Sequence, residues 1–134
     1  MPTPASLPGF KILLAEDNAL NQDLAKRLLT KRGHNVTVVE NGKLALEQLE
    51  QETFDLVLMD LEMPVMDGFE ATQQIHERAK GESGFQLPVI AMTAYDQDEM
   101  KKEIAAARFD GVINKPFIPK ELDADIRAIV DKAR

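Results

Sequence analysis

Five short apolar runs recur along the chain and predict five β-strands. They cover Lys11–Ala15, Val36–Val39, Leu56–Met59, Val89–Met92 and Gly111–Asn114. Three of the five runs are almost continuously apolar rather than alternating, which is typical of parallel strands covered on both faces. The intervening segments carry apolar residues at helical spacing. The four-residue steps of Leu20, Leu24 and Leu28, for example, predict the apolar face of the first helix.

Glycine, proline and acidic residues mark the ends of the predicted helices. Gly33 suits the left-handed position after the first helix, and Pro119 suits the first turn of the last one. Capping-box patterns at Asp67–Glu70 and Asp96–Glu99 predict two further helix starts. Strands that alternate with helices form right-handed βα units. The pattern therefore predicts a flavodoxin-like, doubly wound α/β fold, with a five-stranded parallel sheet in the order 2-1-3-4-5 and helices on both faces.

Polar side chains follow four of the predicted strands. Glu16 and Asp17 follow the first strand, Asp60 the third, Thr93 the fourth and Lys115 the fifth. Ligands bind at the carboxyl ends of such sheets, where these residues converge. Three carboxylates in one crevice repel one another, and a hard divalent cation such as Mg²⁺ would neutralise them. With the metal present, Asp60 would attack a phosphoryl group and form an acyl phosphate, while Thr93 and Lys115 bind its oxygens.

Each of these residues has a plainer interpretation when it is taken alone. Glu16 and Asp17 then belong to a helix cap or a solvated turn, Thr93 ends a strand, and Lys115 is a surface charge. The joint pattern favours a site for a phosphoryl group, because chance would not place suitable polar residues at the ends of four strands along the same edge of the sheet.

Composition and length narrow the class of protein. A chain of 134 residues forms one domain, which we place at 10–134; residues 1–9, with three prolines, predict a flexible tail or linker. The net charge of −7 argues against binding to nucleic acid. The absence of cysteine excludes disulfides and thiol catalysis, and no apolar run is long enough to cross a membrane, so a cytoplasmic location is expected. His34 and His76 have no partner at ligand spacing and are predicted to be surface residues.

The segments "ILLAEDN", "LVLMDLEMPVMDG", "VIAMTA" and "NKPF" resemble the receiver domains of two-component response regulators, in the same order and at the same spacing. The resemblance extends from Phe10 to Arg134. The segment "EDNALNQDLAKRLL" looks most like the corresponding segment of receivers attached to hybrid sensor histidine kinases.

The resemblance implies a role for each residue at the strand ends. Asp60 would accept a phosphoryl group from a phosphohistidine on a histidine kinase or a histidine-phosphotransfer protein, and the domain could form part of a longer hybrid kinase chain. Lys115 would pair with that group, and Thr93 would move toward it and switch the conformation of the domain. The implied Mg²⁺ ligands are Asp17, Asp60, the backbone carbonyl of Glu62 and, through water, Glu16. No turnover of a small-molecule substrate, no nucleic-acid partner and no membrane contact are expected.

Two positions depart from the family pattern. Val112 stands three residues before Lys115, where many receivers carry an aromatic residue that moves with the switch threonine. Arg108 stands where family members often have glycine. Two other functions stay open at this point: a phosphatase with Asp60 as nucleophile, in which Glu62 would replace the usual acid/base aspartate, and a receiver-like domain that only binds proteins.

Overall fold

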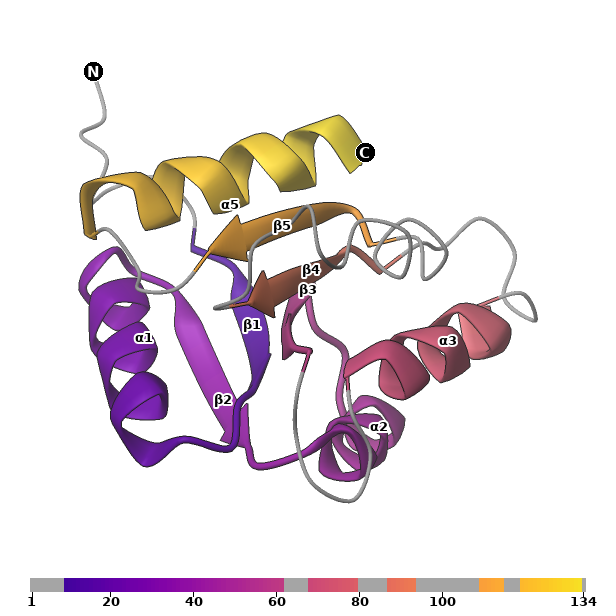
Figure 1. Cartoon of the computed structure of the whole chain (residues 1–134). Helices are drawn as coiled ribbons and strands as arrows, with labels where there is room; N and C mark the ends of the chain where they lie inside the picture. The colour runs from indigo at the N-terminus through magenta and orange to yellow at the C-terminus, as the bar shows by residue number, and fades with distance from the viewer. Residues whose placement is uncertain (1–8, 62–67, 80–86, 94–108, 115–118, 134) are drawn as a thin grey trace.

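A parallel five-stranded sheet forms the centre of the protein in a computed structural model, which describes residues 9–61, 68–79, 87–93, 109–114 and 119–133. The strands are β1 (Lys11–Ala15), β2 (Asn35–Val39), β3 (Leu56–Asp60), β4 (Val89–Thr93) and β5 (Gly111–Asn114). Their order is β2-β1-β3-β4-β5, and all neighbouring pairs are parallel (Figure 1). The predicted strands and their order are confirmed.

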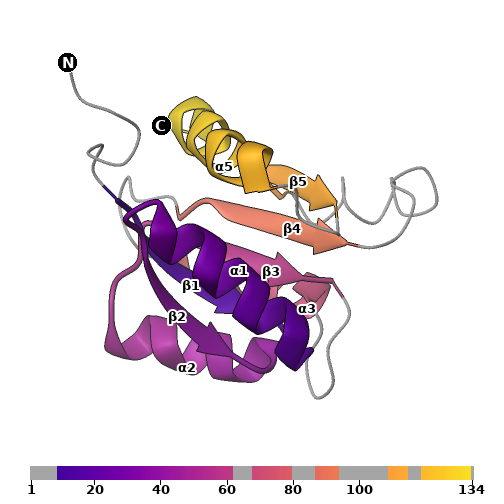
Figure 2. The same ribbon diagram turned by 90° about the vertical axis from the view of Figure 1, so that its left-hand side faces the viewer.

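Helices cover both faces of the sheet. The described helices are α1 (Ala19–Lys31), α2 (Gly42–Gln51), α3 (Gly68–Ala79) and α5 (Pro119–Ala133). Helices α1 and α5 pack on one face and α2 and α3 on the other (Figure 2). The start of α5 at Pro119 was predicted. Within the described part of the chain, no helix combines the length and the apolar character needed to cross a bilayer.

Some predictions fall on parts of the chain that the structure does not describe. The expected helix between β4 and β5, with the capping box Asp96–Glu99 and Arg108, is one of them. Asp67, which would cap α3, is another, although α3 itself begins at Gly68 as expected. Residues 1–8 are also outside the described ranges, so the boundary between tail and domain stays a prediction.

Two apolar cores lie on opposite faces of the sheet, because side chains along a strand alternate between the faces. In β1, Ile12 and Leu14 belong to the core under α1 and α5, whereas Leu13 and Ala15 belong to the core under α2 and α3. All four side chains are fully buried. Burial on both faces is the reason why the sequence of the central strands is almost continuously apolar.

The predicted apolar face of α1 is wrong for Leu20 and Leu24. Leu20 is 81% exposed and Leu24 is 39% exposed, while the buried residues of the helix are Ala25 and Leu29. Leu28 is only partly buried and packs against the edge of the core. The helix therefore presents Ala25 to the sheet, where a small side chain allows close packing. Its leucines at four-residue spacing lie largely on the solvent side.

The end of α1 agrees with the prediction for Gly33. This glycine has a φ of 91°, a left-handed conformation that glycine adopts without steric cost. Its N–H donates to the carbonyl of Thr30 at 3.0 Å, and the N–H of His34 donates to the carbonyl of Leu29 at 3.1 Å. These bonds satisfy the last carbonyls of the helix and direct the chain into β2.

His34, predicted to be a surface residue, is buried. Its side chain is 3% exposed, its ring stacks on that of Phe10, and its Nδ1 accepts the backbone N–H of Phe10 at 2.9 Å. The sequence prediction was wrong because the partner of His34 lies 24 residues away along the chain.

Two aspartates lie just before a strand, as His34 lies just before β2, and each likewise accepts a backbone N–H. Asp55 precedes β3 and accepts the N–H of Lys11 at 2.7 Å; Asp110 precedes β5 and accepts the N–H of Val89 at 2.7 Å. Each of the two aspartates thus binds the backbone N–H at the start of a neighbouring strand. These bonds fix the amino-terminal edge of the sheet, opposite the edge that carries the predicted site.

Candidate functional site

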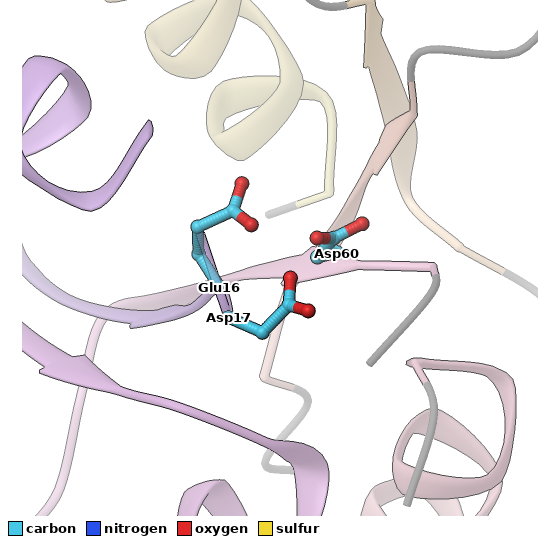
Figure 3. Close-up of side chains that lie close together, drawn as sticks. All are labelled: Glu16, Asp17 and Asp60. Carbon is cyan, nitrogen blue, oxygen red and sulfur yellow. The ribbon is translucent and has the colours of Figure 1, made fainter. Parts of the chain in front are cut away.

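Three carboxylates meet at the carboxyl ends of β1 and β3. The register pairs Ala15 with Met59, so the next residue of each chain segment, Glu16 and Asp60, reaches the same edge of the sheet. One carboxylate oxygen each from Glu16, Asp17 and Asp60 lies within 4.8 Å of the other two (Figure 3). Glu16 and Asp60 are 0% and 7% exposed, whereas Asp17 is exposed. The structure therefore brings together the three acidic side chains that the sequence predicted.

Asp60 is held by the sheet itself. It is the last residue of β3, it is paired with Met92 of β4, and the N–H of Leu61 donates to the carbonyl of Met92 at 3.2 Å. Leu61 is also buried, at 1% exposure. Apolar residues therefore precede and follow Asp60, and they hold its backbone in place while its carboxylate faces the acidic cluster.

The turn between β1 and α1 is tied to the helix by several hydrogen bonds. Asn18 is the N-cap of α1, and its Oδ1 accepts the N–H of Asn21 at 3.0 Å. The N–H of Asn18 donates to Oε2 of Glu16 at 3.1 Å. The capping role that the sequence left open for Glu16 and Asp17 therefore belongs to Asn18, which leaves Asp17 available to the site.

A further residue of this turn was not identified from the sequence. The side-chain amide of Gln22 donates from Nε2 to the backbone carbonyl oxygen of Glu16 at 2.6 Å. A glutamine in the first turns of a helix is common, and no local pattern indicated that it reaches back to the preceding strand.

Thr93 lies at the same edge of the sheet as Asp60. It is the last residue of β4, the strand beside β3, and its side chain is 2% exposed. Its backbone is paired with Asn114, the last residue of β5. Lys115 follows Asn114 directly, but Lys115 and Glu62 lie outside the described residues, so their places in the site stay predictions.

The acidic cluster fits a hard divalent cation. All its side-chain donors are carboxylate oxygens, which Mg²⁺ and Ca²⁺ prefer. Histidine and cysteine, the usual ligands of zinc, contribute nothing to this group. Two of the three carboxylates are buried, so water screens their mutual repulsion poorly, and a cation would relieve it.

The chain belongs to the family of response regulator receiver domains, to which residues 12–127 match. Members of this family are signalling domains rather than metabolic enzymes. The likeness foreseen from the four sequence segments is thus confirmed.

Individual relatives agree with this assignment. The chain is 40% identical over 117 residues to hybrid signal transduction histidine kinase I of Dictyostelium discoideum, covering 84% of this chain and 7% of that protein. It is 39% identical over 127 residues to the autoinducer 2 sensor kinase/phosphatase LuxQ of Vibrio vulnificus, covering 93% of this chain and 14% of that one. The chain thus spans only a small part of these longer kinases.

A solved structure resembles the fold closely. The receiver domain of a sensor histidine kinase from Pseudomonas aeruginosa PAO1 is 33% identical, with a TM-score of 0.81, and the match covers 92% of this chain and 98% of that domain. That structure has a magnesium ion coordinated in its active site cleft.

Proposed function

We propose that Asp60 is the phosphoacceptor of this receiver domain. The observation that carries the proposal is a buried aspartate, fixed at the end of the central strand β3, with two further carboxylates within 4.8 Å. A purely structural aspartate at this position would be destabilised by its acidic neighbours, so the arrangement suits a site that binds a cation and a phosphoryl group.

Mg²⁺ is the proposed metal. Asp17 and Asp60 would bind it directly, Glu16 through water, and the backbone carbonyl of Glu62 would complete the protein ligands. When bound, the ion offsets the negative charge of the carboxylates and of the incoming phosphoryl oxygens. The magnesium ion in the related Pseudomonas receiver supports this choice.

The proposed reaction is a phosphoryl transfer. A carboxylate oxygen of Asp60 forms a bond to phosphorus while the P–N bond of a phosphohistidine breaks, and the electron pair returns to the imidazole nitrogen. Lys115 and Thr93 would bind the oxygens of the transferred group. The domain would catalyse its own phosphorylation and dephosphorylation without turning over a small-molecule substrate.

The proposed donor is a histidine kinase or a histidine-phosphotransfer protein. Similarity to sensor kinases, of which this chain covers only a small share, supports a place for the domain within such a signalling chain. A cytoplasmic location is part of the proposal, because ATP-dependent kinases phosphorylate their histidines there.

The conformational response would begin at Thr93. This residue is buried at the end of β4, so a shift of its hydroxyl toward a phosphoryl group would be transmitted to the backbone that follows. Val112 of β5 is paired with Ala91 of β4 and is partly buried. Since valine has no ring to change rotamer, the response would run through the backbone after Thr93 rather than through an aromatic side chain at Val112.

The proposal is tested with a small phosphodonor. Incubation with acetyl phosphate and Mg²⁺ should add one phosphoryl group to the protein, as measured by intact mass, and Asp60→Asn should abolish the addition. Omission of Mg²⁺ should also abolish it. An adduct that persists in Asp60→Asn would contradict the assignment. Steady hydrolysis of a phosphate ester by the unsubstituted protein would favour the phosphatase alternative instead.

A further inference from the structure

The hydrogen bond from Gln22 reaches the backbone between two of the acidic residues. The carbonyl oxygen of Glu16, which accepts Nε2 of Gln22 at 2.6 Å, belongs to the peptide group that joins Glu16 to Asp17. Because that peptide group is planar, fixing its carbonyl also fixes the direction in which the chain enters Asp17. Gln22 lies in α1 and is partly buried.

The other hydrogen bonds of the turn hold different groups. The N–H of Glu16 donates to the carbonyl of Val39 at 3.0 Å, and the carboxylate of Glu16 accepts the N–H of Asn18 at 3.1 Å. These bonds position the residues on either side of Asp17. Gln22, by contrast, donates its hydrogen bond to the peptide carbonyl that leads into Asp17.

Asp17 needs such support more than its two neighbours do. Glu16 and Asp60 are buried at the ends of strands, whereas Asp17 is exposed and lies in the turn. An exposed turn residue is placed mainly by the backbone that carries it. Removal of a residue that holds a metal ligand in position commonly weakens metal affinity by about 10- to 100-fold.

We propose that Gln22 is a positioning residue for the cation site: through the carbonyl of Glu16 it holds Asp17 where its carboxylate meets those of Glu16 and Asp60. The inference rests on the proposed function and adds to it a residue that touches neither the metal nor the phosphoryl group. A purely structural role for Gln22, as a stabiliser of the start of α1, would leave the affinity of the folded protein for Mg²⁺ unchanged.

The test compares Mg²⁺ binding by the unsubstituted protein and by Gln22→Met, which keeps the length and helix propensity of the side chain but removes the donor. Calorimetric titration with MgCl₂ should show affinity weakened by about tenfold, the lower end of the range for residues that support metal ligands. The phosphorylation rate from acetyl phosphate at saturating Mg²⁺ should change by less than about twofold, since a saturated site holds its ligands in place.

A second variant separates geometry from charge. Gln22→Glu also removes the donor, but it adds a negative charge close to the cation site. If charge alone set the affinity, this variant would bind Mg²⁺ more tightly than the unsubstituted protein; the positioning role predicts weaker binding. Gln48→Met, at a partly buried glutamine in the second half of α2, is the matched control and should leave the affinity unchanged.

A readout without metal completes the test. In the metal-free protein, the backbone amide signals of Asp17 and Asn18 should shift and their hydrogen exchange should accelerate in Gln22→Met, while amides of β3 stay unchanged. Equal Mg²⁺ affinities for the unsubstituted protein and Gln22→Met would overturn the inference and leave the proposed function intact. If the unsubstituted protein itself failed to bind Mg²⁺, the proposed cation site would be refuted, and the role of Gln22 with it.

Discussion

At the scale of single residues, two aspartates show how the burial of the N–H donor decides what a hydrogen bond contributes to stability. Asp110 accepts the N–H of Val89, a residue that is 0% exposed, whereas Asp55 accepts the N–H of Lys11, which lies partly open to solvent. A backbone N–H that water reaches can replace a lost partner, and a buried one cannot.

Replacement of the two aspartates should therefore have unequal effects. We expect Asp110→Ala to lower the free energy of unfolding by about 1–3 kcal/mol, the cost of leaving a buried donor without an acceptor. Asp55→Ala should cost less than about 1 kcal/mol, because water bonds the freed N–H. Urea unfolding followed by circular dichroism measures both. Asp110→Asn, which keeps an acceptor oxygen, is the control, and a larger loss for Asp55→Ala than for Asp110→Ala would contradict the account.

In contrast to Asp110, Thr72 of α3 carries a buried polar group whose removal should not destabilise the protein. Its side chain is 0% exposed, and its hydroxyl has no hydrogen-bond partner among the residues that the structure describes. Thr72→Val keeps the shape and removes the unpaired hydroxyl, so the variant should be as stable as the original or more stable by about 1 kcal/mol. Thr72→Ala, which also removes a buried methyl group, should be less stable than Thr72→Val. A loss of stability in Thr72→Val in thermal unfolding would show that the hydroxyl has a partner.

At the scale of elements, α1 shows that helical spacing of leucines does not identify the buried face. The helix contains leucines on both sides, and the structure buries Leu29 with Ala25 while Leu20 stays 81% exposed. The partners that decide between the two faces are residues of the sheet and of α5, distant in the sequence.

A pair of identical substitutions tests this assignment. Leu29→Ala should lower the free energy of unfolding by about 2–5 kcal/mol, because it leaves a cavity in the core. Leu20→Ala should change it by less than about 0.5 kcal/mol, because the side chain is in water in both states. Chemical unfolding of the two variants under the same conditions measures the difference. Comparable losses would mean that the helix is rotated relative to the described orientation.

At the scale of the whole molecule, the acidic cluster links stability to function. The protein carries a net charge of −7, and three of its carboxylates are concentrated within one site. We expect such a site to cost folding free energy when no cation is present, because function there requires like charges to be close together.

Asp17→Asn should reveal that cost. Without metal, the variant should be more stable than the original, on the order of 1 kcal/mol, because one repelling charge is gone. Mg²⁺ should stabilise the unsubstituted protein, by about 2.7 kcal/mol at a concentration 100 times the dissociation constant, and should have little effect on the variant. Thermal unfolding with MgCl₂ and with EDTA measures both. Equal stabilisation of both proteins by Mg²⁺ would exclude Asp17 from the site.

Much of this architecture could be predicted from the sequence. The central strands were recognisable because burial on both faces makes them almost continuously apolar, and the cluster of Glu16, Asp17 and Asp60 followed from the shared edge of parallel strands. The bonds of His34 and Asp110 could not be predicted, since their partners are 24 and 21 residues away. Nor could Gln22, whose role depends on where its helix lies relative to β1.

The central claim is that Asp60 carries the phosphoryl group, and trapping of the acyl phosphate tests it most directly. After incubation with acetyl phosphate and Mg²⁺, borohydride reduces an aspartyl phosphate to homoserine, which peptide mass spectrometry can assign to a position. We predict homoserine at Asp60 in the treated protein, and none there when Mg²⁺ is left out. Homoserine at Asp17 or at another acidic residue, with Asp60 intact, would contradict the account.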